Sequence, residues 1–121
     1  MKTIFADLKS VLADYSDRLV VKVDTPIEYT LVTKSASPFP QHKGNPMFFA
    51  TVRVGKAYAS FHLMPLYMSP AVAKSVTPAL KKRMQGKTCF NFKTNPAPEL
   101  IADLKNVVEA GLQEWAGKKW L

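Results

Sequence analysis

The sequence predicts an α+β domain in which an antiparallel sheet of about five strands carries helices on one face, as a two-layer sandwich. Amphipathic helical patterns lie at both ends of the chain, and strand patterns joined by short turns lie between them. The strand–helix–strand alternation of a parallel sheet is absent. The length of 121 residues fits a single domain over residues 1–121.

The first predicted element is an amphipathic helix over residues 3–17, in which apolar residues recur at helical spacing. We expect Thr3 to cap this helix, and Asp7 to lie near the positive end of its dipole. The predicted buried face consists of Ile4, Phe5, Leu8, Val11, Leu12 and Tyr15.

Four strand patterns follow. The segments Leu19–Val23 and Ile27–Val32 are rich in β-branched residues. The segments Met47–Val54 and Ala57–Met64 flank the pair Gly55-Lys56, which predicts a β-hairpin with a two-residue turn. In the segment Ala57–Met64, alternation places His62 on the opposite face of the strand from Phe61 and Leu63.

The remaining segments are a long loop, a broken helix, a strand and a final helix. Residues 33–46 are rich in Pro, Ser and Gly, which predicts a loop that is functional or mobile. Residues 71–84 read as helix, with Ser69 as its N-cap, Pro70 at its first position and a break near Thr77-Pro78. Residues 88–92 form a short strand pattern. The last helix is expected to start with Asn95 as N-cap and Pro96 as its first residue, and to bury a face that ends at Trp115.

Composition limits the compartment and the class of protein. The single cysteine, Cys89, cannot form an internal disulfide, and the first residues lack the apolar run of a signal peptide. No stretch approaches the roughly 18 apolar residues of a membrane span. We therefore expect a cytoplasmic protein that does not enter the membrane.

Charge is distributed unevenly along the chain. The net charge is +8, yet no Asp or Glu occurs between Glu28 and Glu99, an interval that contains ten Lys and Arg residues. If the fold gathers this interval on one side, that side will attract an anionic small molecule or nucleic acid. The densest cluster consists of Lys81, Lys82, Arg83 and Lys87.

The aromatic residues beside this cluster allow two interpretations. Cations next to Phe90 and Phe92 on a strand could bind phosphate and stack bases. Alternatively, the cations are a solvated helix face and both rings point to one buried side of the sheet, which is the commoner arrangement. Glycine motifs that bind phosphate are absent.

Catalytic and metal sites have little sequence support. His42, His62 and Cys89 lack the close spacing of a zinc site, and no metal or cofactor is predicted. Asp7 and two further acids, Asp14 and Asp17, share roughly one face of the first helix. His62 beside Cys89 is the one cysteine–histidine pair that could act in catalysis, although a structural histidine is the commoner case.

From Phe48 onward the chain resembles the YdhG-like family of uncharacterised bacterial domains. The resemblance is carried by the stretch 58–68, the stretch 80–92 and the closing helix with Leu100, Ile101 and Leu104. It implies a curved antiparallel sheet. It also implies a frataxin-like role in iron delivery through acidic residues, for which this chain offers Asp7, Asp14 and Asp17.

Together these patterns favour a non-enzymatic binding module with a basic face for an anionic ligand. The candidate contacts are Lys81, Lys82, Arg83 and Lys87, with His62 and Tyr67 as polar neighbours. One alternative is a frataxin-like protein that handles iron or another metal. A second alternative is a small enzyme in which His62 is the acid or base and faces Tyr67 or Cys89.

Overall fold

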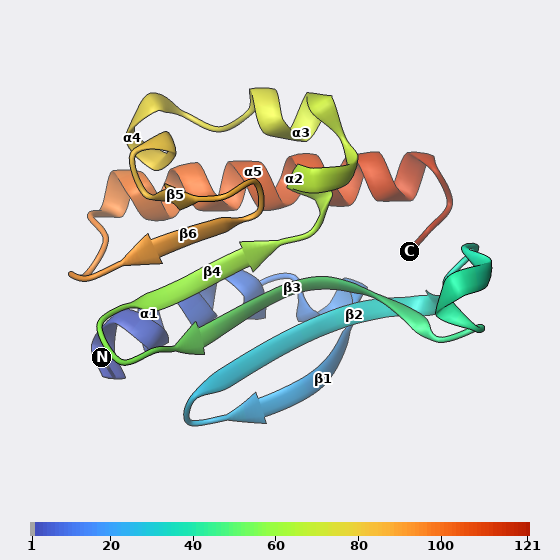
Figure 1. The fold of residues 1–121 in the computed structure, drawn as a ribbon, viewed down its shortest axis with the longest axis horizontal. Helices are drawn as coiled ribbons and strands as arrows, with labels where there is room; N and C mark the ends of the chain where they lie inside the picture. The colour runs from blue at the N-terminus through green and yellow to red at the C-terminus, as the bar shows by residue number, and fades with distance from the viewer. Residues whose placement is uncertain (1) are drawn as a thin grey trace.

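The computed structural model describes residues 2–121 and shows one six-stranded, fully antiparallel sheet (Figure 1). The strand order is β1-β2-β3-β4-β6-β5. The strands are β1 Val20–Thr25, β2 Glu28–Ala36, β3 Pro46–Val54, β4 Ala59–Leu63, β5 Met84–Gln85 and β6 Cys89–Phe92. The helices are α1 Lys2–Ala13, α2 Pro65–Met68, α3 Pro70–Lys74, α4 Pro78–Lys81 and α5 Pro98–Gly117, with 3-10 turns η1 Ser16–Arg18 and η2 Pro40–His42.

Helices from both ends of the chain cover one face of this sheet, as the sequence predicts. In Figure 1, α1 lies behind β3 and β4, and α5 lies beside it. The short helices α2, α3 and α4 pack along α5. The hydrophobic core fills the space between the sheet and these helices, which confirms the α+β class; the sheet has six strands where about five were expected.

The two faces of the sheet are set by the alternation along β4. Ala59, Phe61 and Leu63 are fully buried toward the helices, whereas Ser60 and His62 are half-buried on the opposite face. In β6, Phe90 pairs with Phe61 and is fully buried, as is Phe92. The interpretation of these two phenylalanines as core residues is therefore confirmed.

The predicted side-chain caps of the first and last helices are wrong, because Thr3 and Asn95 form a hydrogen bond with each other instead. Thr3 lies inside α1, and its hydroxyl donates to Oδ1 of Asn95 at 3.1 Å. The Asn95 amide donates in turn to Asp7 at 2.8 Å, and Asp7 lies beyond the first turn of α1. Helix α5 therefore starts later, at Pro98, with Ala97 as N-cap.

Three turns and boundaries also differ from the prediction. The β3–β4 turn spans four residues, closed by the Gly55 N–H donating to the Tyr58 carbonyl at 2.8 Å. Strand β2 runs on to Ala36, so the expected loop is shorter and contains η2. Strand β5 replaces the end of a predicted helix, because it pairs with β6, a non-local contact that periodicity does not reveal.

The broken helix is placed as predicted. Pro70 opens α3 and Pro78 opens α4. Thr77 caps α4 by accepting from the Leu80 N–H at 3.3 Å, and it donates to Asp103 of α5 at 2.9 Å. Ser69 precedes α3 but its hydroxyl donates to Glu114 of α5 instead of capping. These contacts fix the short helices to α5.

Two glycines in α5 provide a test of how closely α2 packs on it. A Cβ at Gly111 would lie 3.0 Å from the ring of Pro65 in α2, whereas a Cβ at Gly117 meets nothing within 4 Å. We expect Gly111→Ala to lower the free energy of unfolding by about 1–3 kcal/mol through overpacking. Gly117→Ala should raise it by up to about 1 kcal/mol through helix propensity. Urea denaturation of both variants measures this, and equal stabilisation by both would contradict close α2–α5 packing.

Candidate functional site

A shallow hollow of about 560 Å³ lies where β4 begins and β6 ends, and cations line it. We call it the basic hollow. Three of its side chains are the cations Lys82, Arg83 and Lys93, and a fourth is the exposed phenol of Tyr58. Its remaining lining residues are Met84, Gln85 and Asn91.

Arg83 is held in place by the sheet edge. Its guanidinium carbon lies 5.7 Å from the ring centre of Phe92, within the range of a cation–π contact. Its carbonyl accepts from the Asn91 N–H at 2.8 Å, next to the β5–β6 ladder. The cation–π contact therefore restricts where the guanidinium lies, and the backbone contact fixes the position of the residue.

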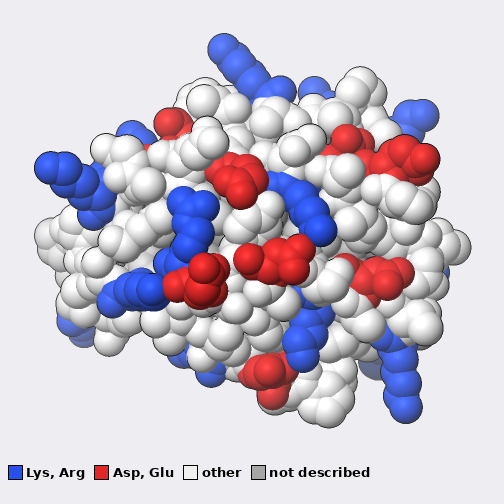
Figure 2. Space-filling view, turned by 180° about the vertical axis from the view of Figure 1, so that it is seen from behind, with Lys and Arg blue, Asp and Glu red and all other residues white. Residues whose placement is uncertain are grey.

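No carboxylate balances these cations within the part of the chain described. The ion pairs found there are Lys9–Asp24, Arg18–Glu109, Arg53–Glu28 and Lys105–Asp14. Acidic and basic side chains interleave on the face seen in Figure 2, which views the molecule from behind the sheet of Figure 1. Most carboxylates lie on α1, η1 and α5 or directly beside them: Asp7, Asp14, Asp17, Glu99, Asp103, Glu109 and Glu114.

The structure separates the residues that the sequence grouped into one site. Lys82 and Arg83 line the basic hollow, but Lys81 at the end of α4 and Lys87 in the β5–β6 turn do not. Tyr67 lines a different hollow and is 64% exposed. His62 lies on the face of the sheet turned away from α1 and α5.

Sequence reasoning missed Lys93, Tyr58 and Asn91 as members of the basic hollow. Lys93 and Asn91 reach it because β6 returns antiparallel beside β5, and Tyr58 reaches it from the start of β4. The short strand pattern after the basic cluster was the available signal. Pairing that strand with a preceding one would have predicted that Lys93 lies near Arg83. The preceding strand, β5, has two residues, which is too short to show as a strand pattern in the sequence.

Both ring nitrogens of His62 contact neighbouring side chains, one at the start of β6 and one directly before it. Nδ1 lies 2.9 Å from the Cys89 sulfur, and Nε2 lies 3.0 Å from the hydroxyl of Thr88. The Phe48 ring packs on the imidazole in an edge-on arrangement at 5.4 Å. The enzyme alternative requires this contact between His62 and Cys89.

Burial disfavours the charged forms of His62 and Cys89. Burial lowers the pKa of His62, and burial raises the pKa of the Cys89 thiol, which a hydrogen bond with Thr88 offsets in part. A catalytic cysteine needs the opposite shift, because the thiolate is the nucleophile.

The acids of the first helix are engaged separately. Asp7 accepts from Asn95, and Asp14 lies 3.0 Å from the Lys105 ammonium. Among residues 2–121, no group of three or more His, Cys, Asp and Glu side chains is close enough to hold a metal ion. Within the same residues, no helix has the length and apolar character to cross a bilayer.

The Cys89 thiol should react slowly. Because its pKa is raised, we expect alkylation by iodoacetamide to follow a single titration with a midpoint above that of free cysteine, about 8.5. The measurement is the alkylation rate against pH, with glutathione as the reference thiol. Fast alkylation near pH 6 would instead reveal a thiolate–imidazolium pair.

His62 should make stability depend on pH. Its folded pKa is below the unfolded value of about 6.5, so the unfolded chain takes up the proton first as the pH falls. The free energy of unfolding should therefore decrease as the pH drops through about 6.5 toward the folded pKa, and this contribution is fully present above that window. Urea denaturation between about pH 5 and 7.5 should show a shallower decrease for His62→Gln than for the wild type. Parallel curves would refute this role of His62.

Comparison of the chain with protein-family models, with curated proteins and with solved structures finds no match in any of the three. The resemblance to the YdhG-like family and the frataxin-like role that it implies therefore stay predictions.

Proposed function

We propose that this domain is a non-enzymatic binding module that holds a phosphate-bearing ligand in the basic hollow. The observation that supports the proposal is the convergence of Lys82, Arg83 and Lys93 on one hollow that no carboxylate lines. Three like charges held close together repel one another, and a bound anion relieves that repulsion.

The donors of the basic hollow suit a phosphate group. The planar fork of Arg83 can hold two phosphate oxygens at once, and the two lysines supply mobile point charges. The Asn91 and Gln85 amides and the Tyr58 hydroxyl add neutral donors at the same surface. Tyr58 also offers a ring on which a base could stack, so the ligand is either a phosphorylated small molecule or a single-stranded nucleic acid.

Neither alternative function has comparable support. An enzyme based on His62 and Cys89 would need an activated thiol, whereas burial raises the pKa of Cys89. A metal-handling function would need converging carboxylates, whereas Asp7 and Asp14 contact different partners. The proposal therefore assigns no catalytic residue and no cofactor.

The proposal predicts that binding depends on the hollow and not on net charge alone. We expect Lys82→Ala, Arg83→Ala and Lys93→Ala each to weaken binding about tenfold or more, because each removes a charge-assisted hydrogen bond. Lys74→Ala, at an exposed lysine of α3 outside the hollow, is the matched control and should have little effect. Isothermal titration with pyrophosphate, a mononucleotide and a short oligonucleotide measures these affinities and separates the ligand classes.

Two outcomes would overturn the proposal. Equal weakening by Lys74→Ala and by the hollow variants would show that binding follows net charge. Absence of binding by all three probes at low salt would show that the cations form a solvated surface. A melting temperature raised by a probe in the wild type and not in Arg83→Ala would support the proposal independently.

A further inference from the structure

A second hollow lies at the opposite end of β4 from the basic hollow. Its volume is about 250 Å³, and Met64, which directly follows β4, lines it, whereas Tyr58 of the basic hollow directly precedes β4. We call it the methionine hollow. Its lining residues are Phe39, Gln41, His42, Met47, Phe48, Met64, Tyr67 and Met68.

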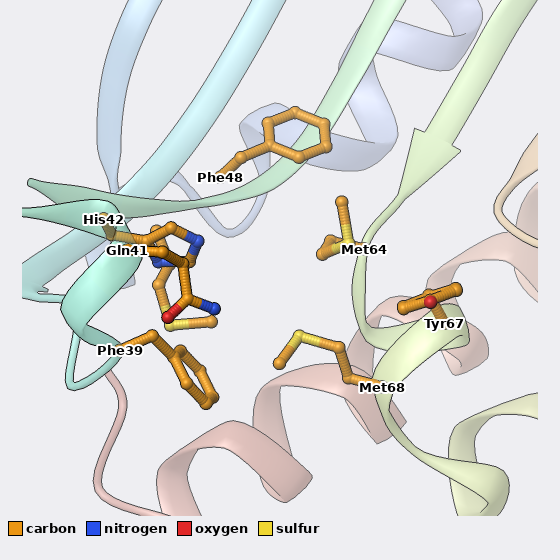
Figure 3. Close-up of a pocket in the computed structure, with 8 residues that line it drawn as sticks. Phe39, Gln41, His42, Phe48, Met64, Tyr67 and Met68 are labelled. Atoms are coloured by element: carbon orange, nitrogen blue, oxygen red, sulfur yellow. The ribbon is translucent and has the colours of Figure 1, made fainter.

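The methionine hollow has two walls (Figure 3). One wall comes from η2 and the residue before it, with Phe39, Gln41 and His42; the other comes from the segment after β4, with Met64, Tyr67 and Met68. Phe48 of β3 lies at one end of the gap between the walls. Segments far apart in the sequence therefore meet at this surface.

Contacts to the core hold the η2 wall in place. The Phe39 ring packs edge-on against Trp120 at 5.4 Å, and Trp120 packs in the same way against buried Trp115 at 5.7 Å. The Ser37 hydroxyl lies 2.6 Å from Nδ1 of His42 and accepts from the Phe39 N–H at 3.1 Å. The hollow is therefore formed before a ligand enters it, as is usual for small-molecule sites.

The lining selects an uncharged, flat, aromatic ligand. No Lys, Arg, Asp or Glu lines the hollow, so a full charge on the ligand would lose its hydration without compensation. Thioether sulfurs make favourable contacts with ring edges, and the unbranched methionine side chain adapts to the shape of a ring. The volume is below the range of sites for drug-sized molecules, which limits the ligand to one or two fused rings.

The polar groups of the η2 wall determine which hydrogen-bonding groups the edge of that ligand should carry. Figure 3 shows the Gln41 amide and the His42 ring beside the gap between the walls. A glutamine amide offers a donor and an acceptor side by side, which matches a ring edge that also carries one of each. Ser37 engages Nδ1 of His42, so Nε2 is the nitrogen left for a ligand.

We propose that the methionine hollow binds a neutral heteroaromatic molecule of one or two rings that carries a donor next to an acceptor. Its ring lies among Met47, Met64 and Met68, and its polar edge faces Gln41. This site is independent of the phosphate-binding function proposed for the basic hollow.

Methionine methyl groups report directly on this site. Three of the five methionines line the hollow, and Met84 lines the basic hollow, so Met84 is an internal control. Adenine is the probe, because it is flat, neutral and carries a donor beside an acceptor. Cyclohexanecarboxamide has the polar edge without the aromatic ring and is the matched control compound.

In the full chain labelled with ¹³C-methyl methionine, we expect adenine to shift the methyl signals of Met47, Met64 and Met68 saturably, with no shift of Met84. Gln41→Leu should weaken adenine binding about fivefold to tenfold through the lost amide contacts. Gln41 is exposed, so the variant keeps the fold. Gln113→Leu, at an exposed position of α5 that lines neither hollow, is the matched control variant and should leave the affinity unchanged.

The same titration can overturn the proposal. Equal shifts with cyclohexanecarboxamide would show that the hollow does not select aromatic rings. A shift of Met84 alone would place adenine in the basic hollow, and no shift at the solubility limit of adenine would show that the methionine hollow binds no such ligand. An unchanged affinity in Gln41→Leu would remove the role of the polar edge.

Discussion

The pairing of β4 with β3 on one side and with β6 on the other is the constraint on which the rest of the structure depends. This strand joins the N-terminal meander to the C-terminal half of the chain, and its alternation assigns the two faces of the sheet. A shift of one residue would expose Phe61 and bury His62, so the register is strongly fixed. Both hollows are formed at the ends of this strand.

The local surface charge depends on how the carboxylates are distributed between the helical layer and the sheet. The helical layer carries most of the carboxylates, where ion pairs such as Lys105–Asp14 and Arg18–Glu109 pair them with cations. Exposed pairs of this kind add little stability. The absence of carboxylates from the basic hollow is more informative. The positive electrostatic potential of Lys82, Arg83 and Lys93 is not neutralised there and can attract an anion.

Sequence reasoning predicted part of the candidate site and missed the part that depends on strand pairing. Lys82 and Arg83 were predicted, since a dense basic cluster is visible in the sequence. Lys93 was missed as their partner, because only the β5–β6 pairing turns it back toward Arg83. The prediction that His62 lies opposite Phe61 is confirmed, whereas the basic hollow does not include it.

By itself the sequence determined the layers of this protein, since helical and strand periodicity depend on local spacing and decide which side of each element is apolar. It also determined the long interval without carboxylates. The tertiary structure decided the ends of α1 and α5, because Thr3, Asp7 and Asn95 satisfy one another across the chain instead of capping helices. It also decided which residues share a hollow, because a hollow is formed by side chains from several segments, and no local pattern encodes their meeting.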